Sequence, residues 1–154
     1  MKIDFRKASI EDVGIYYHWA NDDLVRKNSY EQQKISFEDH IDWFKKKLSS
    51  SDCFFYLFLT DQTPVGQVRI ENKTDETVIG ISIDSKFRGQ GLGARMLEMA
   101  CKDYLTKFPQ TKIFAYIKEN NIPSYKIFKE AEFGNDQSIV VDGIKSIKLS
   151  KNRK

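Results

Sequence analysis

Residues 81–94 read ISIDSKFRGQGLGA, and this stretch decides the fold. An apolar strand that contains Ile81 and Ile83 runs into three alternating glycines, and a long apolar helix follows them. The glycines are Gly89, Gly91 and Gly93. They have no Cβ, so a ligand can approach the backbone closely, and the first N–H groups of a helix have no partners within it. With the helix dipole and the nearby bases Lys86 and Arg88, the turn predicts a phosphate or pyrophosphate site.

Other interpretations of this turn fit less well. A plain strand-to-helix turn needs neither three alternating glycines nor an adjacent arginine. A Walker A loop is excluded, because no Gly-Lys-Ser/Thr follows. Gly89, Gly91 and Ala94 match the loose dinucleotide fingerprint G-x-G-x-x-A. That fingerprint follows the first strand of its fold and needs several further βα units, whereas here a meander precedes it and one such unit follows.

The composition predicts a single soluble, cytoplasmic domain. The chain has 154 residues and a mass of 18.0 kDa, within the usual span of one domain. Its net charge of +3 disfavours nucleic acid and membrane surfaces as partners. No apolar run approaches the roughly 20 residues of a membrane span, and the N-terminus has no secretory signal. The two cysteines predict a reducing compartment, and with the two histidines they make no metal signature.

Periodicity predicts a mixed sheet flanked by helices. Strands are expected at 2–7, 53–60, 65–71, 77–84, 112–117, 137–141 and 144–149. Helices are expected at 9–20, 36–48, 92–105 and 124–130, with a polar connector over 21–35. Short loops make the strands between 53 and 84 an antiparallel meander, one βαβ crossover follows, and Asp142-Gly143 predicts a type I′ hairpin turn. The fold class is therefore α/β (α+β), with one domain over 1–150 and a basic tail over 151–154.

Two motifs resemble the GCN5-related N-acetyltransferase (GNAT) superfamily. Residues 88–93, RGQGLG, are similar to its Arg/Gln-x-x-Gly-x-Gly/Ala signature, and residues 120–133, NNIPSYKIFKEAEF, are similar to its Asn-x-x-Ser/Ala-x-x-x-Tyr/Phe-x-x-x-Gly-Phe segment. The resemblance implies the GNAT fold and acetyl-CoA (coenzyme A) as cofactor, with backbone N–H groups of 88–94 on the pyrophosphate and strand 81–83 along the pantetheine arm. The implied coenzyme-binding residues are Ile81, Ser82, Ile83, Arg88, Gly89, Gln90, Gly91, Leu92, Gly93, Ala94, Asn121, Ser124 and Phe128.

The resemblance also implies direct transfer to a bound amine, without a metal. One N–H of strand 81–83 would polarise the thioester carbonyl, as the donors of an oxyanion hole do. Phe128 stands where many members have a tyrosine acid, and Tyr116 stands where some have a glutamate base. His40, Tyr116 and Tyr125 are the remaining candidates for catalytic proton transfer. A weakly basic amine, such as an amino sugar, needs the least help from a base.

The N-terminal half resembles one subgroup of this family. Residues 18–29 and 40–44 are similar to the Trp-x-Asn-Asp…Val-Arg…Ser…His-x-x-Trp-Phe pattern of acetyltransferases that act on nucleotide-linked amino sugars of the pseudaminic-acid-pathway type. The implied substrate-binding residues are Trp19, Asn21, Arg26, Ser29, Trp43, Gln67 and Arg69. Tryptophan offers a flat surface for a sugar or base, and arginine can bind phosphate through two hydrogen bonds. Alternatively, Trp43 belongs to the core, Arg26 pairs with Asp22 or Asp23, and Arg69 faces solvent.

These features predict an acetyl-CoA-dependent N-acetyltransferase that acts on a primary amine of a small molecule, in particular a nucleotide-linked amino sugar. Two alternatives stay open. One is acetylation of a protein N-terminus, as in ribosomal-protein-modifying relatives, and the other is a non-catalytic acyl-CoA-binding module, which Phe128 favours. No nucleic-acid or membrane partner is expected, and a homodimer is a candidate assembly.

Overall fold

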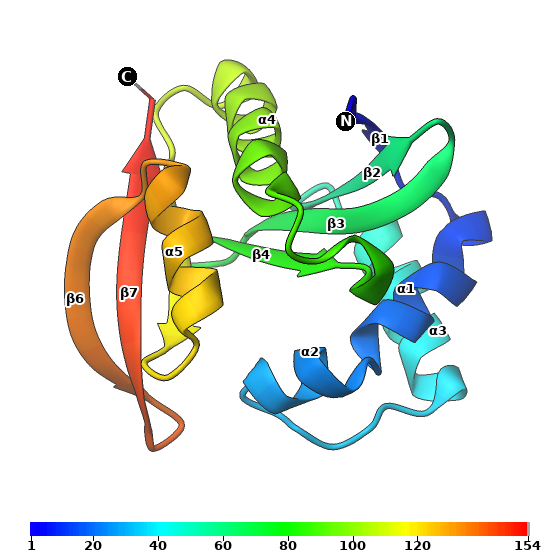
Figure 1. Ribbon diagram of the computed structural model, residues 1–154, viewed down its shortest axis with the longest axis horizontal. Coiled ribbons are helices and arrows are strands. Elements are labelled where there is room, and N and C mark those ends of the chain that lie inside the picture. The colour runs from blue at the N-terminus through cyan, green and yellow to red at the C-terminus, as the bar shows by residue number, and fades with distance from the viewer. Residues whose placement is uncertain (154) are drawn as a thin grey trace.

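In the computed structural model, which describes residues 1–153, a seven-stranded sheet forms the centre (Figure 1). Its strand order is β1-β2-β3-β4-β5-β7-β6. The strands are β1 Asp4–Lys7, β2 Cys53–Thr60, β3 Thr63–Asn72, β4 Thr77–Ile83, β5 Lys112–Lys118, β6 Gly134–Val141 and β7 Ile144–Asn152. The helices are α1 Val13–Ala20, α2 Asp23–Asn28, α3 Phe37–Ser49, α4 Leu92–Lys107 and α5 Ile122–Glu130, with 3-10 helices η1 Ile10–Asp12 and η2 Ser85–Phe87. Among the described residues, none of these helices has the length and apolar character that crossing a membrane requires.

The predicted mixed sheet is confirmed, and its one parallel pair creates an opening. All neighbouring strands run antiparallel except β4 and β5. β4 pairs with β3 from Thr77 to Ile83, but it pairs with β5 only at Thr77 and Val78. Beyond Val78 the two strands diverge, so the backbone N–H and C=O groups on that edge of β4 have no partner strand. Such groups are strong hydrogen-bonding partners for a ligand.

Side chains of β2 alternate between two cores. Tyr56 and Phe58 belong to the larger core, to which α4 contributes Met96, whereas Phe55 and Leu57 belong to a smaller core beneath α1 and α3. This division follows from the strand period of two residues. The helices α4 and α5 therefore cover one face of the sheet, and α1 and α3 cover the other face on its N-terminal side.

The N-terminal helical region differs from the prediction in two places. The helix predicted over 9–20 begins as η1 and continues as α1, because the Asp12 carboxylate accepts the Ser9 N–H at 2.8 Å and is held by Arg6 at 2.8 and 2.9 Å. The predicted connector over 21–35 contains α2, whose N-cap is Asp22. A helix of six residues is too short to leave a readable apolar period.

The C-terminal hairpin is longer than predicted. Asp142 and Gly143 have φ angles of 50° and 78°, as a type I′ turn requires, which confirms the predicted turn. However, β7 continues to Asn152, and the Lys151 ammonium donates to the Ala131 carbonyl at 2.5 Å. The predicted basic tail over 151–154 is therefore wrong at its start, because ladder pairing with β5 extends the strand. Residue 154 lies outside the described residues.

Candidate active site

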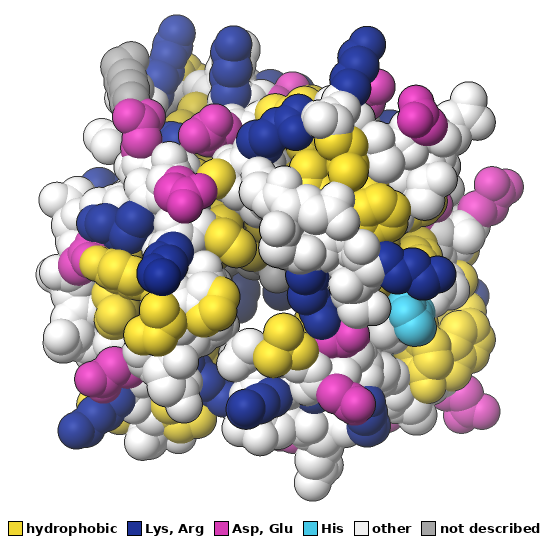
Figure 2. Space-filling view, in the orientation of Figure 1, with side chains coloured by type: hydrophobic (Ala, Val, Ile, Leu, Met, Phe, Trp, Pro, Cys, Tyr) yellow, Lys and Arg dark blue, Asp and Glu magenta, His cyan; other side chains and the backbone are white. Residues whose placement is uncertain are grey.

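Two cavities meet on β4. The inter-strand cavity, of about 330 Å³, lies between the diverging β4 and β5 and the start of α5. The inter-helix cavity, of about 550 Å³, lies between α1, α2, α3 and the strands β3 and β4. Val25, Ser29 and the β4 segment Gly80–Ser82 line both cavities, so the two share a wall. Figure 2 shows the surface hollowed between the α5 side and the α2 side, with basic side chains around the hollow.

The glycine-rich turn adopts a conformation that glycine permits. Gly89 and Gly91 have φ angles of 76° and 75°, and Gly91 is the N-cap of α4. A Cβ on either residue would meet no atom within 4 Å, so the start of α4 is open to a ligand. Gly93 differs, because a Cβ there would lie 2.8 Å from Ile127 Cδ1. Its missing Cβ lets α4 and α5 pack closely, rather than admitting a ligand as the sequence suggested.

The guanidinium of Arg88 has partners within the protein. Its Nε donates to the Ile83 carbonyl at 3.1 Å, and its Nη2 donates to the Asp22 carboxylate at 2.7 Å. Burial alone would raise the pKa of Asp22, but hydrogen bonds from Arg88 and from backbone N–H groups lower it overall. Arg88 therefore joins the N-cap of α2 to the end of β4, and it also lines the inter-strand cavity.

The start of α5 closes the inter-strand cavity. Asn121 is the N-cap, and its side-chain oxygen accepts the Ser124 N–H at 3.3 Å. Phe128 lies further along the helix, is 3% exposed, and packs edge-on against Phe133 with ring centroids 5.0 Å apart. Asn121, Ser124 and Phe128 all line the cavity, so the second sequence motif contributes to the same site as the glycine-rich turn.

The two candidate tyrosines lie in different places. Tyr116 lines the inter-strand cavity, but its hydroxyl donates to Glu76, which also pairs with Lys148 at 3.1 Å. Burial, followed by the bond to Glu76, raises the pKa of Tyr116. Tyr125 lines neither cavity, and its hydroxyl donates at the surface to Asp136 at 2.5 Å. Both hydroxyls therefore have partners away from the wall that the cavities share.

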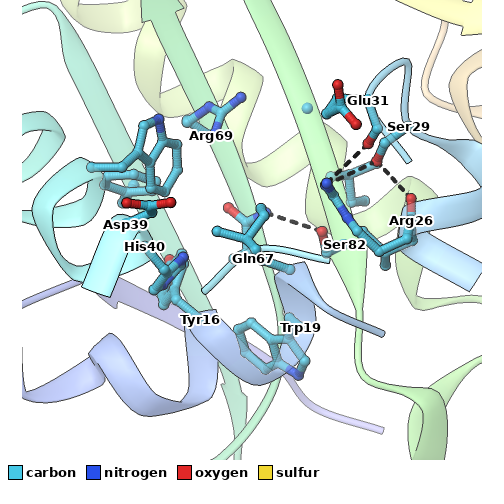
Figure 3. A pocket seen from close by; sticks show the side chains of 17 residues that line it. Tyr16, Trp19, Arg26, Ser29, Glu31, Asp39, His40, Gln67, Arg69 and Ser82 are labelled. Carbon is cyan, nitrogen blue, oxygen red and sulfur yellow. Dashed lines mark hydrogen bonds between the residues drawn. The ribbon is translucent and has the colours of Figure 1, made fainter. Parts of the chain in front are cut away.

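The inter-helix cavity is surrounded by polar atoms without partners. In the described part of the chain, four buried side-chain nitrogen or oxygen atoms have no hydrogen-bond partner, and all four belong to residues that line this cavity (Figure 3). They are Tyr16 Oη, Arg26 Nε, His40 Nε2 and Gln67 Oε1. Buried polar groups in folded proteins are nearly always hydrogen-bonded. Their concentration around one cavity indicates a ligand with several donors and acceptors.

His40 reaches this cavity from α3. It is 2% exposed, and its ring stacks on Phe44 with centroids 5.9 Å apart. Burial lowers the pKa of His40, and a hydrogen bond with the Val13 backbone opposes this with a smaller effect. The lowered pKa favours the neutral ring, and Nε2 has no hydrogen-bond partner in the protein, so it is free to act as an acceptor. That is the protonation state that a general base requires.

Arg26 and Ser29 shape the loop after α2. The Arg26 Nη1 donates to the carbonyls of Glu31 and Gln33 at 2.9 and 3.3 Å, and Nη2 donates to Ser29 Oγ at 3.3 Å. The Ser29 hydroxyl in turn donates to the Val25 carbonyl at 2.6 Å. The ion pair with a neighbouring aspartate of α2, which the sequence left open, does not form between these described residues. Both residues line the inter-helix cavity while they hold the loop.

Asn21 and Trp19 support the cavity wall. The Asn21 amide exchanges two hydrogen bonds with the Ile35 backbone, both of 2.8 Å, and Asn21 lines neither cavity. Trp19 lines the inter-helix cavity, but it is 3% exposed and its Nε1 donates to the Asp84 carboxylate at 2.9 Å. Trp19 is therefore a fixed part of the cavity wall, whereas Asn21 holds the loop at Ile35 through its two hydrogen bonds.

Trp43, Gln67 and Arg69 line the inter-helix cavity together, and Figure 3 labels Gln67 and Arg69 there. The guanidinium of Arg69 lies over the half-buried Trp43 ring, 5.1 Å from its centroid. Arg69 takes part in none of the ion pairs among residues 1–153. The Gln67 Nε2 donates to Ser82 Oγ at 3.2 Å. Arg69 is therefore a cation at the cavity without an anionic partner.

Among the lining residues that the sequence did not predict, four have ionisable side chains. Tyr16, Glu31 and Asp39 line the inter-helix cavity, and Lys118 lines the inter-strand cavity. Tyr16 follows the apolar period of its helix, so its hydroxyl left no signal. Glu31 and Asp39 have the pattern of ordinary surface charges, and Lys118 ends a strand as many lysines do.

Comparisons with known proteins agree with this geometry. The family model described as "Acetyltransferase (GNAT) domain" matches residues 2–134. A curated relative, an uncharacterised protein of Methanocaldococcus jannaschii, is 29% identical over 136 residues, which cover 86% of this chain. The chain spans only 28% of the length of that relative.

Solved structures share the fold. Spermidine N-acetyltransferase from Vibrio cholerae, in complex with CoA and spermine, superposes with a TM-score of 0.86 at 15% identity, covering 97% of this chain and 94% of that chain. Aminoglycoside acetyltransferase AAC(6')-Ib, in complex with coenzyme A, gives 0.82 at 15% identity, with 99% and 95% covered. A domain from Methanocaldococcus jannaschii gives 0.80 at 24% identity, with 97% and 99% covered.

These matches extend over most of the chain, and they confirm the predicted fold class. The family model describes residues 2–134 as an acetyltransferase domain, which is the enzyme family that the sequence predicted. The solved structures that contain coenzyme A are 15% identical to this chain, and they show the fold. The matched residues 2–134 include the glycine-rich turn that opens α4 and the place where β4 diverges from β5. The chain belongs to the acetyltransferase (GNAT) domain family.

Proposed function

We propose that this chain transfers an acetyl group from acetyl-CoA directly to a primary amine of a small molecule, with both substrates bound at once. The observation that carries the proposal is the shared wall of the two cavities at Gly80–Ser82. One cavity adjoins the open glycine-rich turn, and the other contains the unpartnered polar atoms. A thioester and an amine that entered from opposite sides would meet at β4.

The inter-strand cavity fits coenzyme A. The start of α4 is open at Gly89 and Gly91, and its free N–H groups suit a pyrophosphate. The unpaired edge of β4 beyond Val78 suits the amides of the pantetheine arm, which can bond to the backbone of Ile81 and Ile83. Asn121, Ser124 and Phe128 form the opposite wall as proposed coenzyme contacts. When bound, acetyl-CoA supplies an acetyl thioester, and a β4 N–H aimed at its carbonyl oxygen would stabilise developing negative charge.

His40 is the proposed general base. Its neutral ring has a free Nε2 in the wall of the inter-helix cavity, whereas the hydroxyls of Tyr116 and Tyr125 bond to Glu76 and Asp136. No acid is needed at Phe128, because a thiol with a pKa of order 8–9 leaves readily as thiolate near neutral pH. The amine must lose its proton, so the base is the group that this chain has to supply.

A nucleotide-linked amino sugar is the proposed acceptor. The cavity volume of about 550 Å³ lies within the range of roughly 300–1,000 Å³ that is usual for small-molecule sites. Arg69, without an ion-pair partner, suits a phosphate, and the four unpartnered atoms suit sugar hydroxyls. Trp43 and Trp19 supply apolar walls. Binding energy at Arg69 would then orient the sugar amine towards β4.

A second candidate acceptor is a polycationic amine. Glu31 and Asp39 line the inter-helix cavity and are exposed, so they would attract positive charge. This feature supports a polyamine, and it opposes the phosphate that Arg69 favours. The sign of the charge on the preferred acceptor therefore separates the two candidates.

The test is release of coenzyme A thiol from acetyl-CoA in the presence of single acceptors. The panel contains a nucleoside-diphosphate-linked 4-amino sugar, the free amino sugar, spermidine, an aminoglycoside and a peptide with a free N-terminus. We expect turnover with the nucleotide-linked sugar and at least about tenfold lower kcat/KM without the nucleotide. Preference for spermidine would support the second candidate, and preference for the peptide would overturn both.

Tight acetyl-CoA binding with no thiol release for any acceptor would indicate a non-catalytic binding module and overturn the proposed activity. The homodimer and the cytoplasmic location stay predictions from the sequence.

A further inference from the structure

Lys118 is a buried cation without an anionic partner. The buried charged side chains of residues 1–153 are Asp12, Asp84 and Lys118, which are 9%, 8% and 6% exposed. Asp12 is paired with Arg6, and Asp84 accepts the indole N–H of Trp19. Lys118 takes part in none of the ion pairs of the described chain. Burial of a charge is costly unless polar partners compensate it, so its contacts call for an explanation.

The ammonium of Lys118 interacts with one segment of the N-terminal half. Its ammonium donates to the Lys27 carbonyl at 3.1 Å and lies 5.7 Å from the centroid of the Tyr30 ring. Lys27 is in the last turn of α2, where carbonyls have no partner within the helix and favour a cation. The Tyr30 hydroxyl is in turn hydrogen-bonded to Ser146 Oγ at 2.7 Å.

Lys118 and Ser146 form one docking point. They are opposite each other in the β5–β7 ladder, so their side chains project from the same face of the sheet. Together they hold the two ends of the segment Lys27–Tyr30, which is 91 and 116 residues away from them in sequence. At its other end α2 is held by Arg88, through the ion pair with Asp22. The short helix is therefore attached to the C-terminal half at both ends.

The held segment forms part of both cavities. Val25 and Ser29 line the inter-strand and inter-helix cavities alike, and Asn28 lines the inter-strand cavity. Any outward displacement of the end of α2 would open both cavities at once. A six-residue helix has little stability of its own in water, so tertiary contacts must hold it.

We infer that Lys118 and Tyr30 are positioning residues that dock the end of α2 against β5 and β7, and so form the wall that the two substrates share. The consequence for catalysis rests on the proposed function. The docking itself rests on the contacts alone. Loss of the docking weakens binding of both substrates together, whereas a residue that touched one substrate would weaken binding of that substrate only.

The experiment compares Lys118→Met, Lys118→Arg and Tyr30→Phe, with Lys145→Met as a matched control. Lys145 is an exposed lysine on the same hairpin, and it lines neither cavity. Amide hydrogen exchange of residues 25–30 measures the docking directly. We expect exchange at least about tenfold faster in Lys118→Met and in Tyr30→Phe, near-native exchange in Lys118→Arg, and no change in the control.

Binding is measured on the same variants. We expect the Kd of coenzyme A and the KM of the nucleotide-linked amino sugar to rise about tenfold together in Lys118→Met, because one hydrogen bond of a charged donor is lost. In Lys118→Arg, both binding constants should stay close to the wild-type values. In the double variant Tyr30→Phe, Lys118→Met, the loss of binding free energy should be smaller than the sum of the losses in the two single variants. Tyr30→Phe removes only one hydroxyl group and is the less disruptive variant. If Lys118→Met does not fold, the test is made on Tyr30→Phe alone.

Unchanged exchange of residues 25–30 in both Lys118→Met and Tyr30→Phe would overturn the inference. So would faster exchange combined with a rise in only one of the two binding constants, since that result would make Lys118 a direct contact. A wild-type protein that transfers no acetyl group would overturn the proposed function while leaving the exchange result to decide the docking.

Discussion

The two cavities of this protein are built in different ways. In the inter-strand cavity the side chains of Asn121 and Arg88 have partners within the protein, and the open groups belong to the backbone of β4 and of the glycine-rich turn. The inter-helix cavity shares the β4 wall, but it also has four buried side-chain atoms without partners. Backbone groups suit a cofactor that many proteins share, whereas side chains suit a particular substrate.

This difference separates two kinds of variant. Changes that block the backbone at the glycine-rich turn should affect coenzyme A, and changes in the side chains around the inter-helix cavity should affect the acceptor.

The largest effect is expected for Gly91→Leu. A side chain at this left-handed N-cap would occupy the open space in front of α4, so the Kd of coenzyme A should rise at least about 100-fold, as measured by calorimetry. Gly143→Leu is the control, because Gly143 also has a positive φ and open space, but lies in the β6–β7 turn. Both variants should lose about 1–2 kcal/mol of stability through backbone strain. Equal loss of coenzyme A affinity in both would contradict the pyrophosphate site.

His40→Gln should lower kcat about 100-fold, the lower end of the contribution of a general base. His18→Gln, which alters an exposed histidine outside both cavities, should leave kcat unchanged. The rate is measured from pH 5 to pH 9. A His40→Gln rate within threefold of the wild type would remove His40 from the catalytic assignment.

His40 also predicts a pH dependence of stability. Because burial lowers its folded-state pKa below the unfolded value of about 6.5, the folded state resists protonation. Its contribution should be complete above pH 6.5 and decline as the pH falls towards the folded pKa. Urea unfolding at pH 5 and pH 7.5 should show a smaller acid loss in His40→Gln than in the wild type. An identical acid loss would place the titrating group elsewhere.

Arg69→Met should raise the KM of a phosphate-bearing acceptor about 10- to 100-fold, because a charged hydrogen-bond donor is lost from a partly buried site. The methionine still covers the Trp43 ring, so the apolar wall stays. Arg153→Met, at an exposed position near the end of the chain, is the control. If spermidine is the acceptor, Arg69→Met should instead lower its KM, which would decide between the two acceptor classes.

Gly93→Ala should lower the free energy of unfolding by about 1–3 kcal/mol, because the added methyl group would lie 2.8 Å from Ile127. Chemical denaturation measures the change. In a protein that already carries Ile127→Ala, the substitution Gly93→Ala should lower the free energy of unfolding by less than it does in the wild type, because the overpacked side chain is gone. The pair Gly91 and Gly93 then shows that two glycines of one motif serve different purposes. If Gly93→Ala costs as much stability in the Ile127→Ala background as in the wild type, the packing explanation is refuted.

Local patterns predicted much of the fold. The bounds of β2 and the turn at Asp142-Gly143 agree with the structure, because strand alternation and turn chemistry are properties of neighbouring residues. The N-cap at Ser36 likewise marks the start of α3. The helix α2 was missed, since its six residues are held by Arg88 and Lys118 from the other half of the chain.

The residues of the candidate site also divide into those that local sequence patterns predict and those that depend on contacts between distant parts of the chain. The glycine-rich turn was found from sequence because it acts through the backbone of its own segment, whereas Asn121 was named through the family resemblance and only the structure shows it as an N-cap. The hydrogen-bond partners of Arg88 and Trp19 were not predicted, because Asp22 and Asp84 are 66 and 65 residues away from them in the chain. Sequence spacing carries no signal for hydrogen bonds of that range.

By itself, the sequence determined the order of elements, the crossover after β4 and the open turn before α4, because periodicity and missing Cβ atoms act over a few adjacent residues. Only the tertiary structure decided which polar atoms stay unpartnered, that Arg69 lies over Trp43, and that Lys118 holds the end of α2. Whether a buried polar group has a hydrogen-bond partner depends on atoms that several elements bring together in space. The acceptor cavity is lined by residues from several such elements.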